Sequence, residues 1–183
     1  MTRVFISGSR HISRLEAQVQ KRLDRIVEKN LRVLIGDANG ADKAVQLYLH
    51  SKRYQNVEVF CAGSTCRNNV GDWKLRRVLP EAPDKTFDFY AAKDRVMSEQ
   101  ATVGLMIWDG KSAGTLLNVL RLLRRKKKAV VYYAPQHRFW ELKNQSEWAA
   151  FVSRCDNELR NRVEQKASLE ERVEHTSQPS LLT

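Results

Sequence analysis

The sequence has few cysteines and no long apolar run, and both absences restrict the class of protein. Its three cysteines, Cys61, Cys66 and Cys155, are an odd number at unrelated spacings, which match neither a disulfide framework nor a zinc site. No apolar run approaches the roughly 20 residues of a membrane span, and the first residues lack the pattern of a secretion signal. The sequence therefore predicts no metal, no membrane partner and a cytoplasmic location.

The two best-known nucleotide-binding motifs are also absent. Neither the G-x-G-x-x-G fingerprint nor the G-x-x-x-x-G-K-[ST] loop occurs, which argues against dehydrogenase chemistry and ATP hydrolysis of those types. The four histidines are scattered, so no set of nucleophile, base and orienting group emerges. We therefore assign no catalytic residue and no cofactor from the sequence.

Acidic residues are scarce relative to basic ones in most of the chain. The formal net charge is +11; residues 1–134 hold 25 Lys and Arg against 13 Asp and Glu, whereas the remainder holds 7 against 8. A basic surplus confined to one part favours an anionic ligand, either a nucleotide or a nucleic acid. A solubility surplus on solvated faces explains the same numbers, so charge alone does not decide.

Short apolar runs alternate with helical patterns through residues 1–134, the expected nucleotide-binding domain. Strands are expected at 3–7, 32–35, 57–61, 103–108 and 129–133, and helices at 14–29, 41–52, 90–101 and 114–127. Ser13 and Glu16 form a capping box before the first helix. The weakly patterned stretch 62–89 is interpreted as a long loop with one short helix near Trp73 to Val78. This alternation predicts an α/β fold with a Rossmann-like, doubly wound parallel sheet of about five strands, in the order 3-2-1-4-5.

Residues 135–183 are expected to form a C-terminal helical extension. Apolar residues recur every three to four positions from Trp148 to Val163, and less regularly to Leu169 and Val173, which predicts one long amphipathic helix. The sequence after His175 has no pattern and predicts a loose tail. The helix either packs on the sheet or pairs with a second copy of the chain, so a homodimer is one alternative.

Three turns rich in glycine and small polar residues follow strands of the expected sheet. They contain Gly8, Ser9 and Arg10; Gly36, Asp37, Gly40 and Asp42; and Asp109, Gly110, Lys111, Ser112, Gly114 and Thr115. Glycine lets a ligand approach the backbone, and each turn opens a helix whose first N–H groups are unpaired and bind phosphate readily. Although any turn favours glycine, three such turns at one sheet edge predict a site for the phosphate end of a nucleotide.

The order and spacing of four short motifs resemble the SLOG superfamily. The motifs are Gly8-Ser9-Arg10 and the stretches 36–42, 93–97 and 108–115. The superfamily includes the LOG phosphoribohydrolases, the DNA-processing protein A family and small prokaryotic proteins of unassigned role. The chain is most similar to the last group, over residues 1–134, and the C-terminal helix lies outside the resemblance.

The LOG enzymes cleave the N-glycosidic bond of nucleoside monophosphates with an arginine before the fourth strand and a G-G-x-G-T-x-x-E turn after it. The resemblance implies that Arg95 matches this arginine and that Gly114 and Thr115 match the G-T pair. Asn118 stands where the catalytic glutamate is expected, so the chain departs from the enzymes at the residue that performs the chemistry. An amide still hydrogen-bonds ribose hydroxyls, so Arg95 and Asn118 join the expected ligand-binding residues.

These observations favour a protein that binds a nucleotide or a nucleotide-derived small molecule as a sensor or adaptor. A nucleotide N-glycosidase of the phosphoribohydrolase type is the first alternative, and Asn118 counts against it. A DNA-binding protein is the second alternative, supported by the net charge and the DNA-processing relatives. Aromatic and basic residues do not interleave on the expected strands, which counts mildly against nucleic acid.

Overall fold

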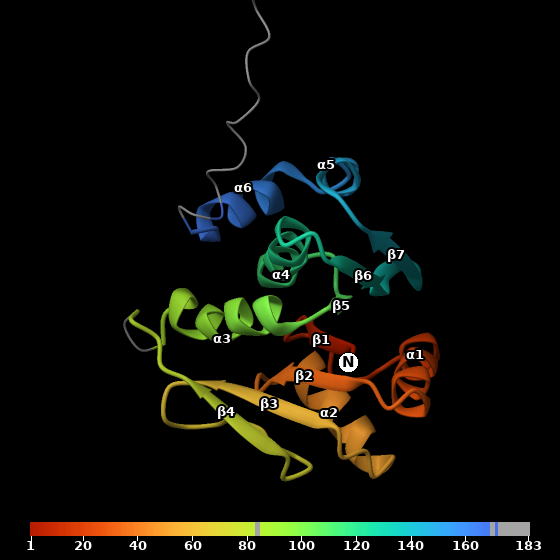
Figure 1. Ribbon diagram of the computed structural model, residues 1–183. Helices are drawn as coiled ribbons and strands as arrows, with labels where there is room; N and C mark the ends of the chain where they lie inside the picture. The colour runs from red at the N-terminus through yellow and green to blue at the C-terminus, as the bar shows by residue number, and fades with distance from the viewer. Residues whose placement is uncertain (83–84, 169–170, 172–183) are drawn as a thin grey trace, which may run out of the picture.

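Helices cover both faces of one sheet in the computed structural model of the protein (Figure 1). The structure describes residues 1–82, 85–168 and 171. The strands are β1 (Arg3–Gly8), β2 (Arg32–Gly36), β3 (Val57–Ala62), β4 (Lys74–Val78), β5 (Val103–Trp108), β6 (Lys128–Tyr133) and β7 (Arg138–Leu142). The helices are α1 (Ala17–Glu28), α2 (Ala41–Ser51), α3 (Phe87–Gln100), α4 (Ala113–Arg124), α5 (Gln145–Val152) and α6 (Asn157–Lys166), with a 3-10 turn at Ala134–Gln136.

The strands lie in the order β4-β3-β2-β1-β5-β6-β7. The five strands expected from the sequence are β1, β2, β3, β5 and β6; they take the expected order and pair in parallel. The expected number of strands is wrong, because β4 pairs in parallel with β3 and β7 pairs antiparallel with β6. The strand order reverses between β1 and β5, so a ligand is expected at the carboxyl ends of these two strands.

β4 occupies a stretch for which the sequence predicts a loop and a short helix, and that prediction is wrong. Four of its five residues are exposed, and three of these, Lys74, Arg76 and Arg77, are basic. Charged side chains are typical of edge strands, because they discourage pairing with other chains. Backbone pairing with β3 holds β4 in place, and such pairing leaves no apolar pattern in the sequence.

The single long helix expected after Trp148 is also wrong. The apolar stripe from Trp148 to Val163 spans two helices, α5 and α6. Asp156 separates them, because its side chain accepts a hydrogen bond from the Leu159 N–H at 2.7 Å and caps a new helix. β7 precedes both helices and joins the main sheet.

The C-terminal elements pack against the rest of the fold. The expected domain boundary at residue 134 lies in the 3-10 turn between β6 and β7, two strands of the same sheet. α5 and α6 lie over α4 (Figure 1). Leu169, Val173 and the tail after His175 lie outside the described residues.

Apolar side chains form one cluster on each face of the sheet. Phe5 and Met106 face the layer of α3, α4, α5 and α6, whereas their neighbours Ile6 and Ile107 face α1 and α2. Successive strand residues point to opposite faces, so strands covered on both sides are apolar throughout. None of the helices within the described residues is long and apolar enough to cross a membrane.

The expected capping box at the start of the first helix does not form. α1 begins at Ala17, and Glu16 is its N-cap residue without a side-chain cap hydrogen bond. The Glu16 carboxylate instead accepts a hydrogen bond from the Tyr132 hydroxyl at 2.6 Å and contacts the His137 ring. The hydrogen bond from Tyr132 lowers the pKa of Glu16. Glu16 therefore joins the start of α1 to the end of β6.

Cys61 and Cys66 form a disulfide, so the prediction that the cysteines match no disulfide framework is wrong. Cys61 lies in β3 and Cys66 in the loop that follows it, and a separation of five residues makes the closed ring short. Cys155 is free and partly buried. The disulfide constrains the loop immediately before Arg67, whose side chain enters the site described below.

A buried ion pair ties the end of the described chain to α4. Arg121 is 1% exposed, and its Nε donates to Glu171 Oε1 at 2.6 Å. Burial opposes ionisation of Glu171, but the hydrogen bond and charge of Arg121 outweigh it and lower the pKa of Glu171 to about 2. Because this pKa is below the ordinary glutamate pKa, the pair contributes its full stabilisation when the pH is above that ordinary pKa. Its contribution is lost as the pH falls toward the folded-state pKa.

Replacing Glu171 by alanine is expected to lower the free energy of unfolding at neutral pH by about 3 kcal/mol, because the buried Arg121 guanidinium loses its carboxylate. Urea denaturation measures the difference in the free energy of unfolding between the wild type and the variant, and this difference should become smaller as the pH is lowered. Asp88→Ala is the matched control, because Asp88 pairs with Arg95 at the surface and its loss should cost less than about 1 kcal/mol. Equal losses in the two variants would contradict a stabilising buried pair.

Candidate nucleotide-binding site

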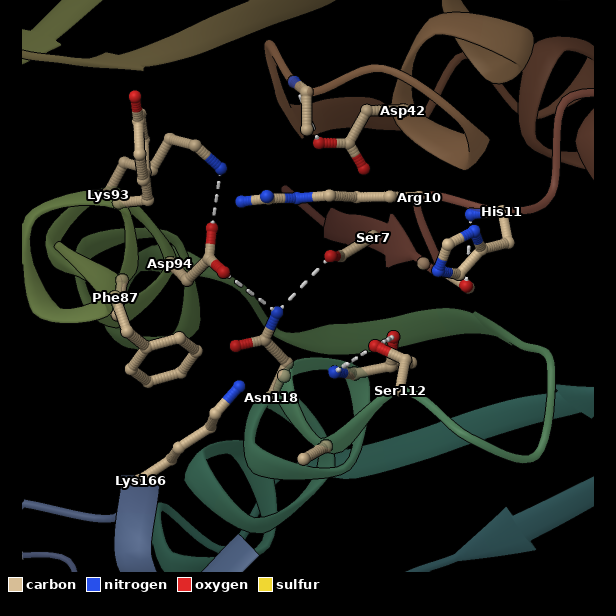
Figure 2. Close-up of a pocket in the computed structure, with 18 of the residues that line it drawn as sticks. Ser7, Arg10, His11, Asp42, Phe87, Lys93, Asp94, Ser112, Asn118 and Lys166 are labelled. Carbon is tan, nitrogen blue, oxygen red and sulfur yellow. Dashed lines mark hydrogen bonds and ion pairs between the residues drawn. The ribbon is translucent and has the colours of Figure 1, made fainter. Parts of the chain in front are cut away.

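A cavity of about 600 Å³ opens at the carboxyl ends of β1 and β5, where the strand order reverses (Figure 2). Small-molecule sites occupy roughly 300–1,000 Å³, so the cavity has the size of a ligand site. Ten of the fifteen residues expected at the site line it: Gly8, Ser9, Arg10, Asp42, Asp109, Lys111, Ser112, Gly114, Thr115 and Asn118. The structure thus brings the turns after β1 and β5 together.

Asp109 joins these two turns. Its Oδ2 accepts a hydrogen bond from the Ser9 hydroxyl at 2.6 Å, and its Oδ1 accepts from the backbone N–H groups of Lys111 and Ser112 at 3.0 and 2.9 Å. Burial acts to raise the pKa of Asp109, but the hydrogen bonds outweigh burial and hold the pKa below its ordinary value. The Ser9 hydroxyl, expected as a donor to the ligand, is therefore used to hold the two turns together.

The first turn of α4 presents unpaired N–H groups to the cavity. Ser112 is the N-cap residue, and its Oγ accepts a hydrogen bond from the Thr115 N–H at 3.3 Å. Across the part of the chain that the structure describes, no acceptor lies on the N–H groups of Ala113 and Gly114. The positive end of the α4 dipole faces the same space, so this turn can bind an anionic oxygen.

The turn between β2 and α2 shapes the cavity from behind. A side chain at Gly40, where φ is +84°, would collide with the backbone of Arg10. A side chain at Gly36 would collide with Asp42 and with Lys93 Nζ, which lies 2.6 Å from the position of such a Cβ. Neither glycine lines the cavity, so their role is to let side chains and backbone pack closely behind it.

Asp37 also lies behind the cavity, where it positions an arginine. It is 1% exposed, and its carboxylate accepts hydrogen bonds from Nε and Nη2 of Arg67 at 3.1 and 2.7 Å. Burial acts to raise the pKa of Asp37, but the hydrogen bonds from Arg67 and the charge of Lys93 outweigh burial. The pKa of Asp37 is therefore below its ordinary value. The backbone of the same loop is anchored, because Asn68 Nδ2 donates to the Asp37 carbonyl at 2.7 Å. The long loop after β3 therefore delivers Arg67 to the cavity.

Aromatic and cationic side chains form one wall. The guanidinium groups of Arg67 and Arg10 lie 4.6 and 5.7 Å from the centroid of the Tyr90 ring. Phe87 also lines the cavity, one helical turn before Tyr90 on α3. Guanidinium groups bind phosphate oxygens, and aromatic faces stack on planar rings, so this wall suits a ligand with both features.

Asp42 is the buried acid of the cavity. It is 3% exposed, its Oδ2 accepts from the Ala38 N–H at 3.3 Å, and its Oδ1 has no hydrogen-bond partner within the described residues. Burial raises the pKa of Asp42 to about 7, although the nearby charge of Lys93 lowers it. Figure 2 shows the carboxylate facing the side chain of Arg10. A buried acceptor without a donor is costly, so Asp42 is ready to accept a hydrogen bond from a ligand.

Asn118 lines the cavity floor, but its amide is already hydrogen-bonded within the protein. The amide nitrogen donates to Ser7 Oγ at 3.2 Å and to Asp94 Oδ2 at 3.1 Å (Figure 2). The amide oxygen accepts from Arg121 Nη1 at 2.8 Å. Asn118 is 1% exposed. It is therefore held as a structural bridge in this state, rather than presented as a donor to ribose.

Five expected residues lie outside the cavity: Gly36, Asp37, Gly40, Arg95 and Gly110. Arg95, which the family resemblance implies, instead donates from Nη2 to Asp88 Oδ1 at 2.7 Å and lies 3.6 Å from Glu171. Lys93 and Asp94, two and one positions earlier on α3, face the cavity in its place and pair with each other at 2.7 Å.

Sequence reasoning missed the face of α3 and both side chains from α6. Phe87, Tyr90 and Asp94 line the cavity and recur at helical spacing, a pattern that was available in the sequence. Arg162 and Lys166 on α6 also line it. Only the tertiary packing of the C-terminal elements brings these two side chains to the cavity.

One cluster among the described residues combines groups that bind metals elsewhere. Ligand atoms of Asp37, Cys61 and Cys66 lie within 4.8 Å of one another. The two sulfur atoms are joined in the disulfide, and the Asp37 carboxylate is hydrogen-bonded to Arg67. The groups are therefore engaged with one another and with Arg67, and we assign no metal to them.

Comparison with known proteins identifies the fold. No protein-family model matches the sequence, and no curated protein matches it either. Among solved structures, the fold is similar to that of DNA processing protein A from Helicobacter pylori. That structure was reported for the way in which the protein binds single-stranded DNA. The TM-score is 0.57 at 12% sequence identity, over 90% of this chain and 79% of the other. The protein therefore has a Rossmann-like fold of the kind found in DNA processing protein A.

Asp42→Asn is expected to stabilise the protein by about 1–3 kcal/mol near pH 8 and to have little effect near pH 4. The folded-state pKa of about 7 exceeds the ordinary value of 3.8, so the folded protein binds the proton more tightly than the unfolded chain. Stability is therefore lost as the pH rises through this range, and the asparagine removes that loss. Urea denaturation at the two pH values measures the change in the free energy of unfolding. Glu158→Gln, at an exposed carboxylate, is the control. A variant less stable than the wild type near pH 8 would contradict the assignment.

Proposed function

We propose that the protein binds a nucleotide or a nucleotide-derived small molecule in the cavity between the turns after β1 and β5. The observation that carries this proposal is the convergence of the unpaired α4 N–H groups and the Arg10 guanidinium on one cavity that also contains Asp42. The N–H groups bind a phosphate, and Asp42 accepts a hydrogen bond from a sugar hydroxyl. The wall formed by Tyr90 and Phe87 stacks on the base.

Binding without hydrolysis of the glycosidic bond fits the chemistry of the floor. That reaction builds positive charge on the sugar and requires a carboxylate to stabilise it or to activate water. Asn118 supplies a neutral amide with three hydrogen bonds already made, and the neighbouring Asp94 carboxylate is paired with Lys93. A role as a nucleotide sensor or adaptor is consistent with this site.

Gly114→Val is expected to abolish nucleotide binding and to leave the fold intact. A Cβ at Gly114 meets only Phe87, at 3.7 Å, so the branched side chain has room to extend into the cavity where the phosphate lies. Isothermal titration with a panel of nucleoside monophosphates, diphosphates and cyclic nucleotides measures binding, and circular dichroism reports the fold. Chromatography of the same mixtures should detect no released base.

The matched control for this variant is Gly114→Ala, which adds only the tolerated Cβ and is expected to weaken binding by less than about tenfold. Unchanged affinity in the valine variant would exclude the α4 turn as the phosphate site. Release of free base would make the protein an enzyme rather than a binding module.

A second candidate function is binding of single-stranded nucleic acid. The solved structure with a similar fold is described as binding single-stranded DNA, and this chain carries a net charge of +11. Lys74, Arg76 and Arg77 lie exposed along the edge strand β4, outside the cavity. This basic edge is where the backbone of a nucleic acid would bind on this hypothesis.

If the basic edge binds single-stranded DNA, affinity for an oligonucleotide is expected to fall steeply with salt, by a slope of about −0.7 per phosphate neutralised. The double variant Arg76→Gln/Arg77→Gln should reduce that slope by about 1 to 2, because one phosphate contact is lost with each guanidinium. Filter binding at several salt concentrations measures it, with Lys21→Gln/Lys43→Gln on α1 and α2 as the charge-matched control. No retention at low salt would remove nucleic acid as a ligand.

A further inference from the structure

Helix α6 contributes two cations to the cavity from outside residues 1–134, the part of the chain in which the sequence predicts the binding site. Arg162 and Lys166 both line the cavity, and a spacing of four residues places them on one face of the helix. Figure 2 shows the Lys166 ammonium group extending from α6 into the space between Phe87 and Asn118. The C-terminal helix is therefore a wall of the site as well as a cover for α4.

Contacts on both sides hold these cations at the cavity. Arg162 Nη2 donates to the Lys111 carbonyl at 3.3 Å, so α6 is attached to the turn that opens α4. The Lys166 ammonium lies 4.7 Å from the centroid of the Phe87 ring, which fixes it beside α3. These contacts place the α6 cations beside the turn that opens α4, and the one carboxylate within ion-pair distance of them among the described residues is the exposed Glu158, 4.0 Å from Arg162 Nε.

The charge of the cavity exceeds what one phosphate requires. Among the described residues that line it, seven are Arg or Lys and three are Asp. Lys93 is paired with Asp94, Arg67 is paired with Asp37 behind the wall, and Arg162 Nε lies 4.0 Å from the exposed Glu158. In the described parts of the chain, no carboxylate lies within ion-pair distance of Arg10, Lys111 or Lys166. These three cations outnumber the roughly two negative charges that a phosphate group carries at most, so a single phosphate does not pair with all of them.

We propose that α6 forms a second phosphate subsite and that the ligand carries two adjacent phosphates, as in a nucleoside diphosphate or a pyrophosphate-linked nucleotide. The first phosphate binds the Ala113 and Gly114 N–H groups, and the second binds Arg162 and Lys166. This inference rests on the proposed phosphate site at α4, and it specifies the ligand class. It assigns to the C-terminal extension a direct part in recognition.

The test uses the full-length protein with four probes: inorganic phosphate, inorganic pyrophosphate, AMP and ADP. Isothermal titration is carried out on the wild type, on Arg162→Gln/Lys166→Gln, and on the charge-matched control Lys21→Gln/Lys43→Gln. Glutamine keeps helix propensity and removes the charge, and circular dichroism checks the fold. The inorganic probes report the subsites independently of which base the protein prefers.

The wild type is expected to bind pyrophosphate at least about tenfold more tightly than phosphate. The α6 variant should lose about tenfold for pyrophosphate and ADP while phosphate and AMP change less than twofold, and the control should change none of the four.

Three outcomes would each count against a different part of the proposals. Equal loss for single-phosphate and double-phosphate probes, or no loss in the α6 variant, overturns the second subsite and leaves nucleotide binding standing. Pyrophosphate binding that depends on α6, with no binding of either nucleotide, supports the subsite and counts against an adenine nucleotide as the ligand. Failure of all four probes to bind overturns both proposals.

Discussion

A row of hydrogen-bonded polar side chains crosses the protein beneath the cavity, and Asn118 stands at its centre. Its amide links Ser7 of β1, Asp94 of α3 and Arg121 of α4, and Arg121 continues the row to Glu171. These groups are buried, where each unsatisfied polar atom carries a large cost and each satisfied one rigidifies its neighbours. The shape of the cavity floor, and the attachment of the C-terminal segment to the sheet, therefore depend on one amide that donates to a carboxylate and accepts from a guanidinium.

The same requirement separates a structural role from a catalytic one at position 118. A carboxylate there would pair with Arg121 but would face Asp94 at hydrogen-bond distance, and two ionised carboxylates in a buried site repel each other. An amide avoids this repulsion and satisfies both neighbours. In contrast, Oδ1 of Asp42 has no hydrogen-bond partner among the residues that the structure describes. The row is satisfied internally, whereas this buried oxygen of Asp42 is not, so the proposed ligand would gain a hydrogen bond at Asp42 rather than at Asn118.

The sequence predicts the central sheet well because β1, β2, β3, β5 and β6 are covered on both faces and must be continuously apolar. It fails at β4 and β7, which lie at the edges, where backbone pairing rather than burial defines a strand. The turns after β1 and β5 were predictable from glycine and small polar residues. Arg67 was not, because its place depends on Asp37 and on the disulfide in the preceding loop, and neither contact leaves a periodic pattern.

The contribution of α6 shows why charge summed along the chain is a poor guide to a site. Residues 135–183 carry 7 basic and 8 acidic side chains, so this part has almost no net charge, and the sequence assigns the anionic ligand to residues 1–134 alone. Arg162 and Lys166 line the cavity, whereas Glu158, one turn before Arg162, is not part of the cavity lining and is exposed to water, 4.0 Å from Arg162 Nε. Exposed carboxylates are screened within about 10 Å, but cations at a partly enclosed cavity beside a helix N-terminus are screened less. The potential that a ligand meets is therefore set by which side chains the helix turns inward.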